Sequence, residues 1–117
     1  MVTATLSALS ARLVTVDLAK SGNATETADY MLASMITILA GDQSGSTTLV
    51  AKQDNLSEND EEVIITGSCT DGTCSGTSTK MVTIVDTTAP PTVTLSADPM
   101  MIHETGATTS ALIMATL

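Results

Sequence analysis

The chain has almost no aromatic side chains. Its 117 residues include no Trp, no Phe and a single Tyr, at position 30. A core must therefore be built from aliphatic residues and methionine, and Met31, Met100 and Met101 are expected to fill it. A cleft for binding sugars would lack its usual aromatic stacking surface, which argues against a hydrolase that uses paired carboxylates.

The chain is also poor in positive charge. Only 4 Lys and Arg residues accompany 13 Asp and Glu residues, which gives a net charge of −9 at pH 7. Nucleic-acid-binding proteins carry a basic surface, and anionic membranes attract basic segments. We therefore expect neither kind of partner. The acidity fits a cation-rich extracellular setting, although it could also serve only to keep the chain in solution.

Long apolar runs and catalytic motifs are missing as well. The longest apolar stretch, residues 31–40, is too short to span a bilayer and is interrupted by Ser34 and Thr37. Residues 1–5 lack the features of a signal peptide, so we expect any export signal to lie outside this segment. There is no glycine-rich phosphate loop, no HExxH helix and no Ser-His-Asp arrangement at meaningful spacing. We expect no enzymatic activity.

Two cysteines, Cys69 and Cys74, flank a turn with Asp71 and Gly72 at its apex. Cysteines on either side of a hairpin turn can close a small disulfide, which requires an oxidising compartment. A CxxxxC pair without a second pair or nearby histidines is a poor zinc site. We therefore expect a disulfide, with two free thiols as the alternative.

Apolar and polar residues alternate with a period of two along much of the chain. This pattern predicts strands over residues 2–6, 12–18, 35–39, 47–51, 62–66, 80–86, 92–95 and 110–117. No stretch of ten residues keeps its apolar positions at helical spacing. Regularly spaced strands with turn residues between them predict an all-β fold, an antiparallel β-sandwich.

The chain is expected to contain one domain and the edge of another. Residues 87–91 have no apolar periodicity and are stiffened by Pro90 and Pro91, as in a linker. The final residues, MATL at 114–117, echo TATL at 3–6 with an offset of 111 positions. An offset of about one domain length indicates a window of a tandem array. Two similar strands in a chain rich in threonine would produce the same echo.

Acidic residues are concentrated in residues 53–62, which hold five of the 13 and none of the basic ones. The segment lies between two strand-like runs. Crowded carboxylates repel one another unless solvent or a cation offsets the repulsion, and Ca²⁺ takes about 6–8 oxygen ligands. The segment is therefore a candidate calcium site, with a solvated loop as the alternative.

Four motifs occur in order between residues 22 and 86. They are GNATETADY at residues 22–30, ITILAG at 36–41, DNLSENDEEV at 54–63 and VTIVD at 82–86. In this order they resemble the Calx-β repeat, an immunoglobulin-like β-sandwich found in sodium/calcium exchangers and in tandem arrays of large bacterial surface proteins. Thr27 stands where that family usually has a glycine.

The resemblance implies a circularly permuted sandwich. The family's repeat begins with a strand and a Glu, which residues 92–95 and Glu104 match only after the closing strand. Residues 1–89 would then be an immunoglobulin-like sandwich lacking its first strands. Residues 90–117 would be a linker and the first strands of the next repeat, or donor strands for a neighbouring copy. A donor from a separate chain would duplicate the strand at residues 1–6, which favours a covalent array.

The resemblance also implies a set of calcium ligands. Calcium-binding members of the family use the opening Glu, the aspartate before the tyrosine, the acidic turn and the final aspartate. The matching positions here are Asp29, Asp54, Glu58, Glu61, Asp86 and Glu104. Gln53 and Asn55 stand where the family often has further aspartates. Because lower ligand charge weakens a site, one Ca²⁺ is expected rather than a cluster.

The function implied is structural. The chain would be a non-enzymatic module of an extracellular or cell-surface stalk, adhesin or fibre in a bacterium. Identical or similar copies would follow one another end to end, with Ca²⁺ making the junctions rigid. Two alternatives remain open: a calcium-sensing regulatory module, and an adhesin domain that binds carbohydrate or a cell surface. A sensor needs a responding domain, and an adhesin needs an exposed recognition loop, for which the hairpin at residues 69–74 is the candidate.

Overall fold

The computed structural model describes residues 1–117 and is all-β, with antiparallel sheets and no helix. The predicted all-β class is therefore confirmed, and no helix has the length and apolarity needed to cross a membrane. The chain divides into two compact units, Met1–Thr87 and Thr88–Leu117. The division lies just before the boundary expected at the prolines, and what each part represents remains a prediction.

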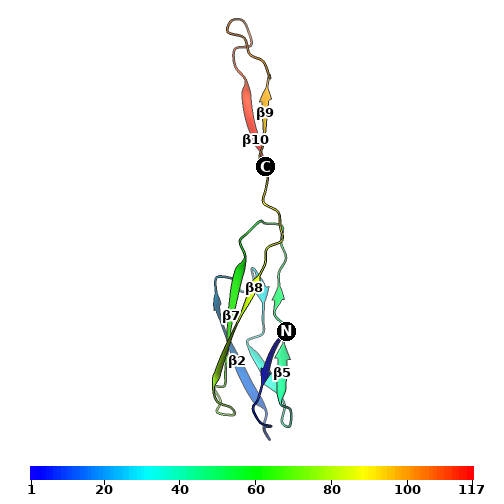
Figure 1. Ribbon diagram of the computed structural model, residues 1–117, viewed down its shortest axis with the longest axis vertical. Coiled ribbons are helices and arrows are strands. Elements are labelled where there is room, and N and C mark those ends of the chain that lie inside the picture. The colour runs from blue at the N-terminus through cyan, green and yellow to red at the C-terminus, as the bar shows by residue number, and fades with distance from the viewer. The chain divides into compact units, whose positions relative to one another are not determined.

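Eight of the ten strands belong to the first unit (Figure 1). They are β1 (Val2–Thr5), β2 (Val14–Gly22), β3 (Tyr30–Met31), β4 (Met35–Ile38), β5 (Ser44–Thr47), β6 (Val50–Ala51), β7 (Glu61–Ser68) and β8 (Thr77–Ile84). The main sheet has the order β4-β2-β7-β8, and two further two-stranded sheets pair β1 with β5 and β3 with β6.

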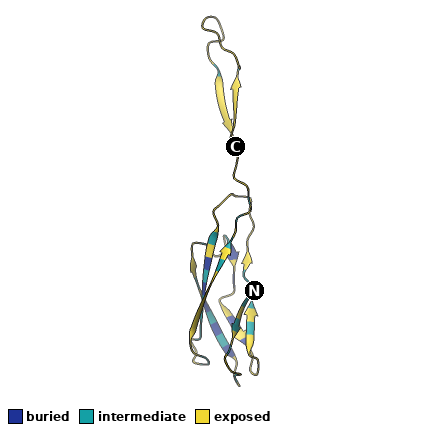
Figure 2. Ribbon diagram, viewed as in Figure 1, coloured by how far each residue is buried: buried dark blue, intermediate teal, exposed yellow.

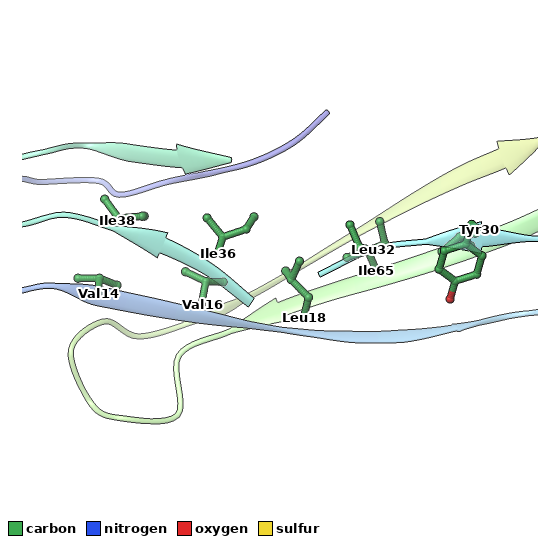
Figure 3. Packing of buried hydrophobic residues seen from close by; sticks show 9 residues of the cluster. Val14, Val16, Leu18, Tyr30, Leu32, Ile36, Ile38 and Ile65 are labelled. Atoms are coloured by element: carbon green, nitrogen blue, oxygen red, sulfur yellow. The ribbon is translucent and has the colours of Figure 1, made fainter. Parts of the chain in front are cut away.

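The core of the first unit lies on one face of the main sheet (Figure 3). Because side chains alternate across a strand, Val14, Val16 and Leu18 of β2 point to the same face, and all three are buried. β4 and β7 contribute buried residues in the same alternating way. The full set of buried residues is Val14, Val16, Leu18, Tyr30, Leu32, Ile36, Ile38, Val63 and Ile65.

The expected role of the methionines is wrong. Met31, Met100 and Met101 are exposed, at 57%, 90% and 75% of their surface. Met31 follows Tyr30, which is only 2% exposed, so strand alternation directs the methionine away from the core. The other two belong to the second unit, which contributes no residue to the buried core.

Strand boundaries differ from the sequence prediction around β5. The run at residues 47–51 divides into the end of β5 and β6, which pair with different partners. β5 passes so close to β4 that a Cβ atom on Gly45 would lie 2.4 Å from the carbonyl oxygen of Thr37. Only glycine fits there, and a strand that begins with Ser44 and Gly45 has no apolar alternation to reveal it.

The second unit is a hairpin of β9 (Thr94–Asp98) and β10 (Leu112–Thr116). Within the loop between the strands, His103 N–H donates a hydrogen bond to the Thr108 carbonyl at 2.8 Å. Every residue of both strands is exposed (Figure 2). A two-stranded hairpin without a covering layer buries little apolar surface and is marginally stable on its own in water.

Candidate functional site

The acidic segment is an exposed, irregular loop that is fixed at both ends. At its start, Lys52 N–H donates to the Asp29 carbonyl at 2.8 Å, which extends the pairing of β3 with β6. At its end, Glu61 begins β7 and pairs with Ile84 of β8. Three segments that are distant in the sequence therefore meet here: the turn before Tyr30, the loop itself, and the residues that follow β8.

The turn before Tyr30 holds Asp29 in place. Thr27 N–H donates to the Tyr30 carbonyl at 2.8 Å, and Asp29 N–H donates to the Thr25 carbonyl at 2.9 Å. The Asp29 side chain accepts a hydrogen bond from Thr25 N–H at 2.5 Å through Oδ2. Because Tyr30 is buried in the core, the half-buried Asp29 carboxylate sits at a defined position beside the loop.

Glu61 lies close to two other carboxylates, and its pKa is raised above the ordinary value of 4.5. The largest cause is desolvation of the side chain, and a hydrogen bond with the Asp29 side chain follows. The negative charges of Asp29 and Glu58 add to the shift. A cation would offset both the desolvation and the negative neighbours, and so would stabilise the charged form of Glu61.

Asp86 is attached to the same loop. Its Oδ2 accepts a hydrogen bond from Glu58 N–H at 2.7 Å. In return, Asp86 N–H donates to Asp60 Oδ1 at 3.1 Å. This exchange follows from the β7–β8 register, because Glu61 opposite Ile84 brings residue 86 beside residues 58–60. Asp60 is a member of the group that the sequence analysis did not single out.

The remaining expected ligands are Asp54 and Glu104. Asp54 Oδ1 accepts a hydrogen bond from Leu56 N–H at 2.9 Å, a local Asx turn within the loop. Glu104 lies on an exposed loop of the second unit. No group of three or more His, Cys, Asp or Glu side chains is arranged so that it could hold a metal ion as it stands. Calcium coordination by these residues therefore remains a prediction.

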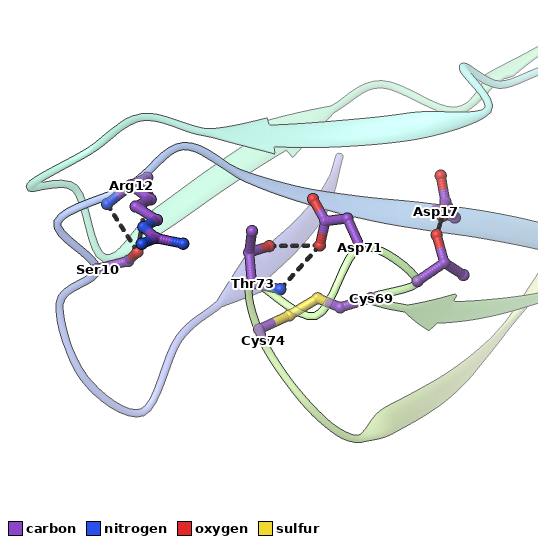
Figure 4. Close-up of a disulfide and its surroundings, with 8 residues drawn as sticks. Ser10, Arg12, Asp17, Cys69, Asp71, Thr73 and Cys74 are labelled. Carbon is purple, nitrogen blue, oxygen red and sulfur yellow. Dashed lines mark hydrogen bonds between the residues drawn. A yellow bond between two sulfur atoms is a disulfide. The ribbon is translucent and has the colours of Figure 1, made fainter.

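The two cysteines are joined at the hairpin between β7 and β8 (Figure 4). Their Cα atoms are 5.6 Å apart, which fits the disulfide expected from the sequence. Asp71 accepts hydrogen bonds from Thr73 N–H at 3.0 Å and from Thr73 Oγ1 at 2.6 Å. These bonds hold the pKa of Asp71 below its ordinary value of 3.8. Thr70 Oγ1 also donates a hydrogen bond to the Asp17 side chain on β2. The hairpin is therefore held by the disulfide and by hydrogen bonds, one of which reaches a neighbouring strand.

Comparison of the chain with described protein families, with curated proteins and with solved structures found no match.

Proposed function

We propose that this chain is a non-enzymatic structural module of the Calx-β type, with the corresponding immunoglobulin-like sandwich, in an extracellular array of similar units. Its acidic loop would bind one Ca²⁺ and so stiffen the junction with the next unit. The proposal is supported by the all-β fold with a disulfide, and by the way the fold gathers acidic residues at one place in the first unit.

The observation that carries the proposal is that the fold brings the turn of Asp29, the loop of Glu58 and the start of β7 with Glu61 together. The raised pKa of Glu61 agrees with this, and none of the three carboxylates forms an ion pair with a Lys or Arg side chain. Their chemistry suits a hard cation that prefers oxygen ligands. The side chains would have to turn toward a common point, because they do not yet surround one.

Each residue would have a distinct role in this site. Asp29 is the fixed ligand, since its turn is tied to the core through Tyr30. Glu58 and Glu61 would supply the mobile carboxylates, one from the loop and one from the start of β7. Asp86 would couple the ion to the linker that follows β8, because it already bonds to Glu58 N–H.

The backbone of Thr27 supports the family assignment by a separate route. Thr27 has φ of 77°, and it is the only non-glycine residue with a positive φ in the chain. A β-branched residue in this region is strained, and glycine is the residue that adopts it without strain. Thr27, which stands where the family usually has a glycine, thus has a backbone conformation that glycine adopts without strain.

A thermal melt with and without calcium tests the proposal. CaCl2 should raise the melting temperature and EDTA should reverse the change, because a ligand that binds only the folded state stabilises it by about 2.7 kcal/mol at roughly 100 times its Kd. Asp29→Asn should abolish the response. Asp42→Asn, in the turn between β4 and β5, is the matched control and should keep it. A melting temperature that ignores calcium in the unaltered chain would refute the calcium site.

A further inference from the structure

The first unit is open along one side. A groove of about 770 Å³ is lined by β1 and by the start of β8. Core residues Val16, Leu18 and Ile65 also line it. β1 pairs only with β5, and β8 only with β7, so each of these strands leaves one edge without a partner. A groove that reaches core residues and is bordered by free strand edges is suited to receive an added strand.

The second unit carries a strand of the matching kind. Val93, Leu95 and Ala97 alternate with polar residues along β9 and its preceding residue. Val93 is 63% exposed and Leu95 70% exposed. Alternation places these three side chains on one face of the strand. The hairpin therefore presents an apolar face that nothing in its own unit covers.

The echo between the chain's ends supplies a register. β10 (Leu112–Thr116) runs into Ala-Thr-Leu at 115–117, and β1 runs into Ala-Thr-Leu at 4–6. β9 pairs with β10 so that Leu95 lies opposite Ala115. If β1 takes the place of β10, Leu95 lies opposite Ala4 and Ala97 opposite Val2.

This register agrees with the burial of β1. Val2 and Ala4 are half-buried and pack against the core. Residues directly opposite each other in an antiparallel pair point to the same face, so Leu95 and Ala97 would also point into the core. A slip of one residue would turn both to solvent. The register taken from the sequence echo is thus the one that buries the apolar face.

We propose that β9 of a second copy of this chain docks along the free edge of β1 and fills this groove. In the docked state, β9 pairs with β1 of the other copy instead of with β10. Its hydrogen bonds to β10 are replaced by hydrogen bonds to β1, and the apolar face of β9 becomes buried. Because only β9 is donated, β1 is not duplicated. The inference does not depend on calcium.

The chain's own β9 is a poor candidate for the groove. A strand antiparallel to β1 would run in the same direction as β8, because β1 and β8 run in opposite directions (Figure 1). Parallel neighbouring strands need a connection of about a dozen residues or more. Only residues 85–93 separate β8 from β9, and they include Pro90 and Pro91.

Sedimentation velocity over a range of concentrations tests the association. The unaltered chain should self-associate in EDTA as well as in calcium. Leu95→Lys should weaken association by at least about tenfold, because the buried leucine is lost. Ile113→Lys on β10 is the matched control, because this residue is also exposed. It should have no effect on association, because β10 does not take part in the docked pair. A chain that stays monomeric at every concentration would overturn the proposal.

Cysteine pairing tests the register and the source of the strand. Ala4→Cys on one polypeptide and Leu95→Cys on a second should form a mixed disulfide under mild oxidation, because opposite residues place their Cβ atoms about 4.5–5.5 Å apart. Thr3→Cys with Leu95→Cys is the control with the two side chains on opposite faces, and it should not react. Cross-linking only within one polypeptide that carries both cysteines would overturn donation by a second copy. Equal reaction of the control would overturn the register.

Discussion

The carboxyl group of Glu61 is influenced by that of Asp29: desolvation first and then this neighbour raise the pKa of Glu61. A proton on one of the two carboxyl groups would relieve the repulsion between them. Asp29 comes from the turn before β3 and Glu61 from the first residue of β7, which are 32 positions apart in the sequence. The fold thus creates a place where a proton or a metal ion can relieve the repulsion between carboxylates.

The first prediction concerns the stability of the metal-free chain. Because the pKa of Glu61 is raised, the protonated form favours the folded state below pH 4.5, and this contribution is lost as pH rises through the folded-state pKa. Glu61→Gln should therefore raise the melting temperature at pH 7 in EDTA, and the difference should shrink near pH 4. Thermal melts at both pH values measure this difference. A variant that is less stable at pH 7 would contradict the proposed repulsion, and Asp42→Asn serves as the charge control.

A second prediction concerns competition between protons and calcium. Protonated carboxyl groups do not bind Ca²⁺, so the calcium-induced increase in melting temperature should be present at pH 7.5 and absent at pH 4. Because calcium competes with protons for these carboxylates, the midpoint should move to lower pH as the calcium concentration rises. Melts at several calcium concentrations over this range provide the measurement. An increase that is equal at pH 7.5 and pH 4 would exclude Glu61 as a ligand.

A third prediction tests the strained turn. Thr27→Gly should stabilise the chain by about 1 kcal/mol, because glycine adopts the φ of 77° without the steric cost that threonine bears. Thr25→Gly in the same turn is the control, and it should destabilise because it only adds freedom to the unfolded chain. Equilibrium unfolding in urea measures both. Destabilisation by Thr27→Gly would show that the threonine side chain makes a contribution larger than the strain.

A fourth prediction concerns the hairpin disulfide. Cys69 and Cys74 close a short loop, with a sequence separation of 5. The entropic stabilisation expected for a loop of this size is about 2 kcal/mol. Reduction with dithiothreitol should lower the free energy of unfolding by up to that amount, and the double variant Cys69→Ser with Cys74→Ser should match the reduced protein. Oxidised and reduced chains of equal stability would indicate that the hydrogen bonds of Asp71 alone hold the hairpin.

Much of the fold can be predicted from the sequence, because a strand with one buried face shows alternating apolar and polar residues. The buried faces of β2 and β7 follow directly from Val14-Val16-Leu18 and Val63-Ile65. β3 and β5 were not predicted, because β3 has two residues and β5 consists of Ser44, Gly45, Ser46 and Thr47. Their positions depend on tertiary contacts, such as the close approach of Gly45 to Thr37, which alternation does not reveal.

The candidate site, too, could be predicted only in part from the sequence. The acidic composition of the loop predicts a cluster, but its members depend on strand register. Asp60 joins Asp86 through a β7–β8 register that the sequence does not specify, whereas Asp54 turns back on Leu56. The open groove could not be predicted from the sequence either, because it depends on which strand edges remain without partners in the fold.

The most direct test of the calcium site is a titration of the isotopically labelled chain with CaCl2, monitored by the carboxyl carbon and amide resonances in NMR spectra. We predict that the carboxyl resonances of Asp29, Glu58 and Glu61 shift together and saturate with one equivalent of Ca²⁺, while that of Asp42 stays in place. Shifts that are absent, or spread evenly over all acidic residues without saturation, would contradict the proposal that this group of carboxylates is a calcium site.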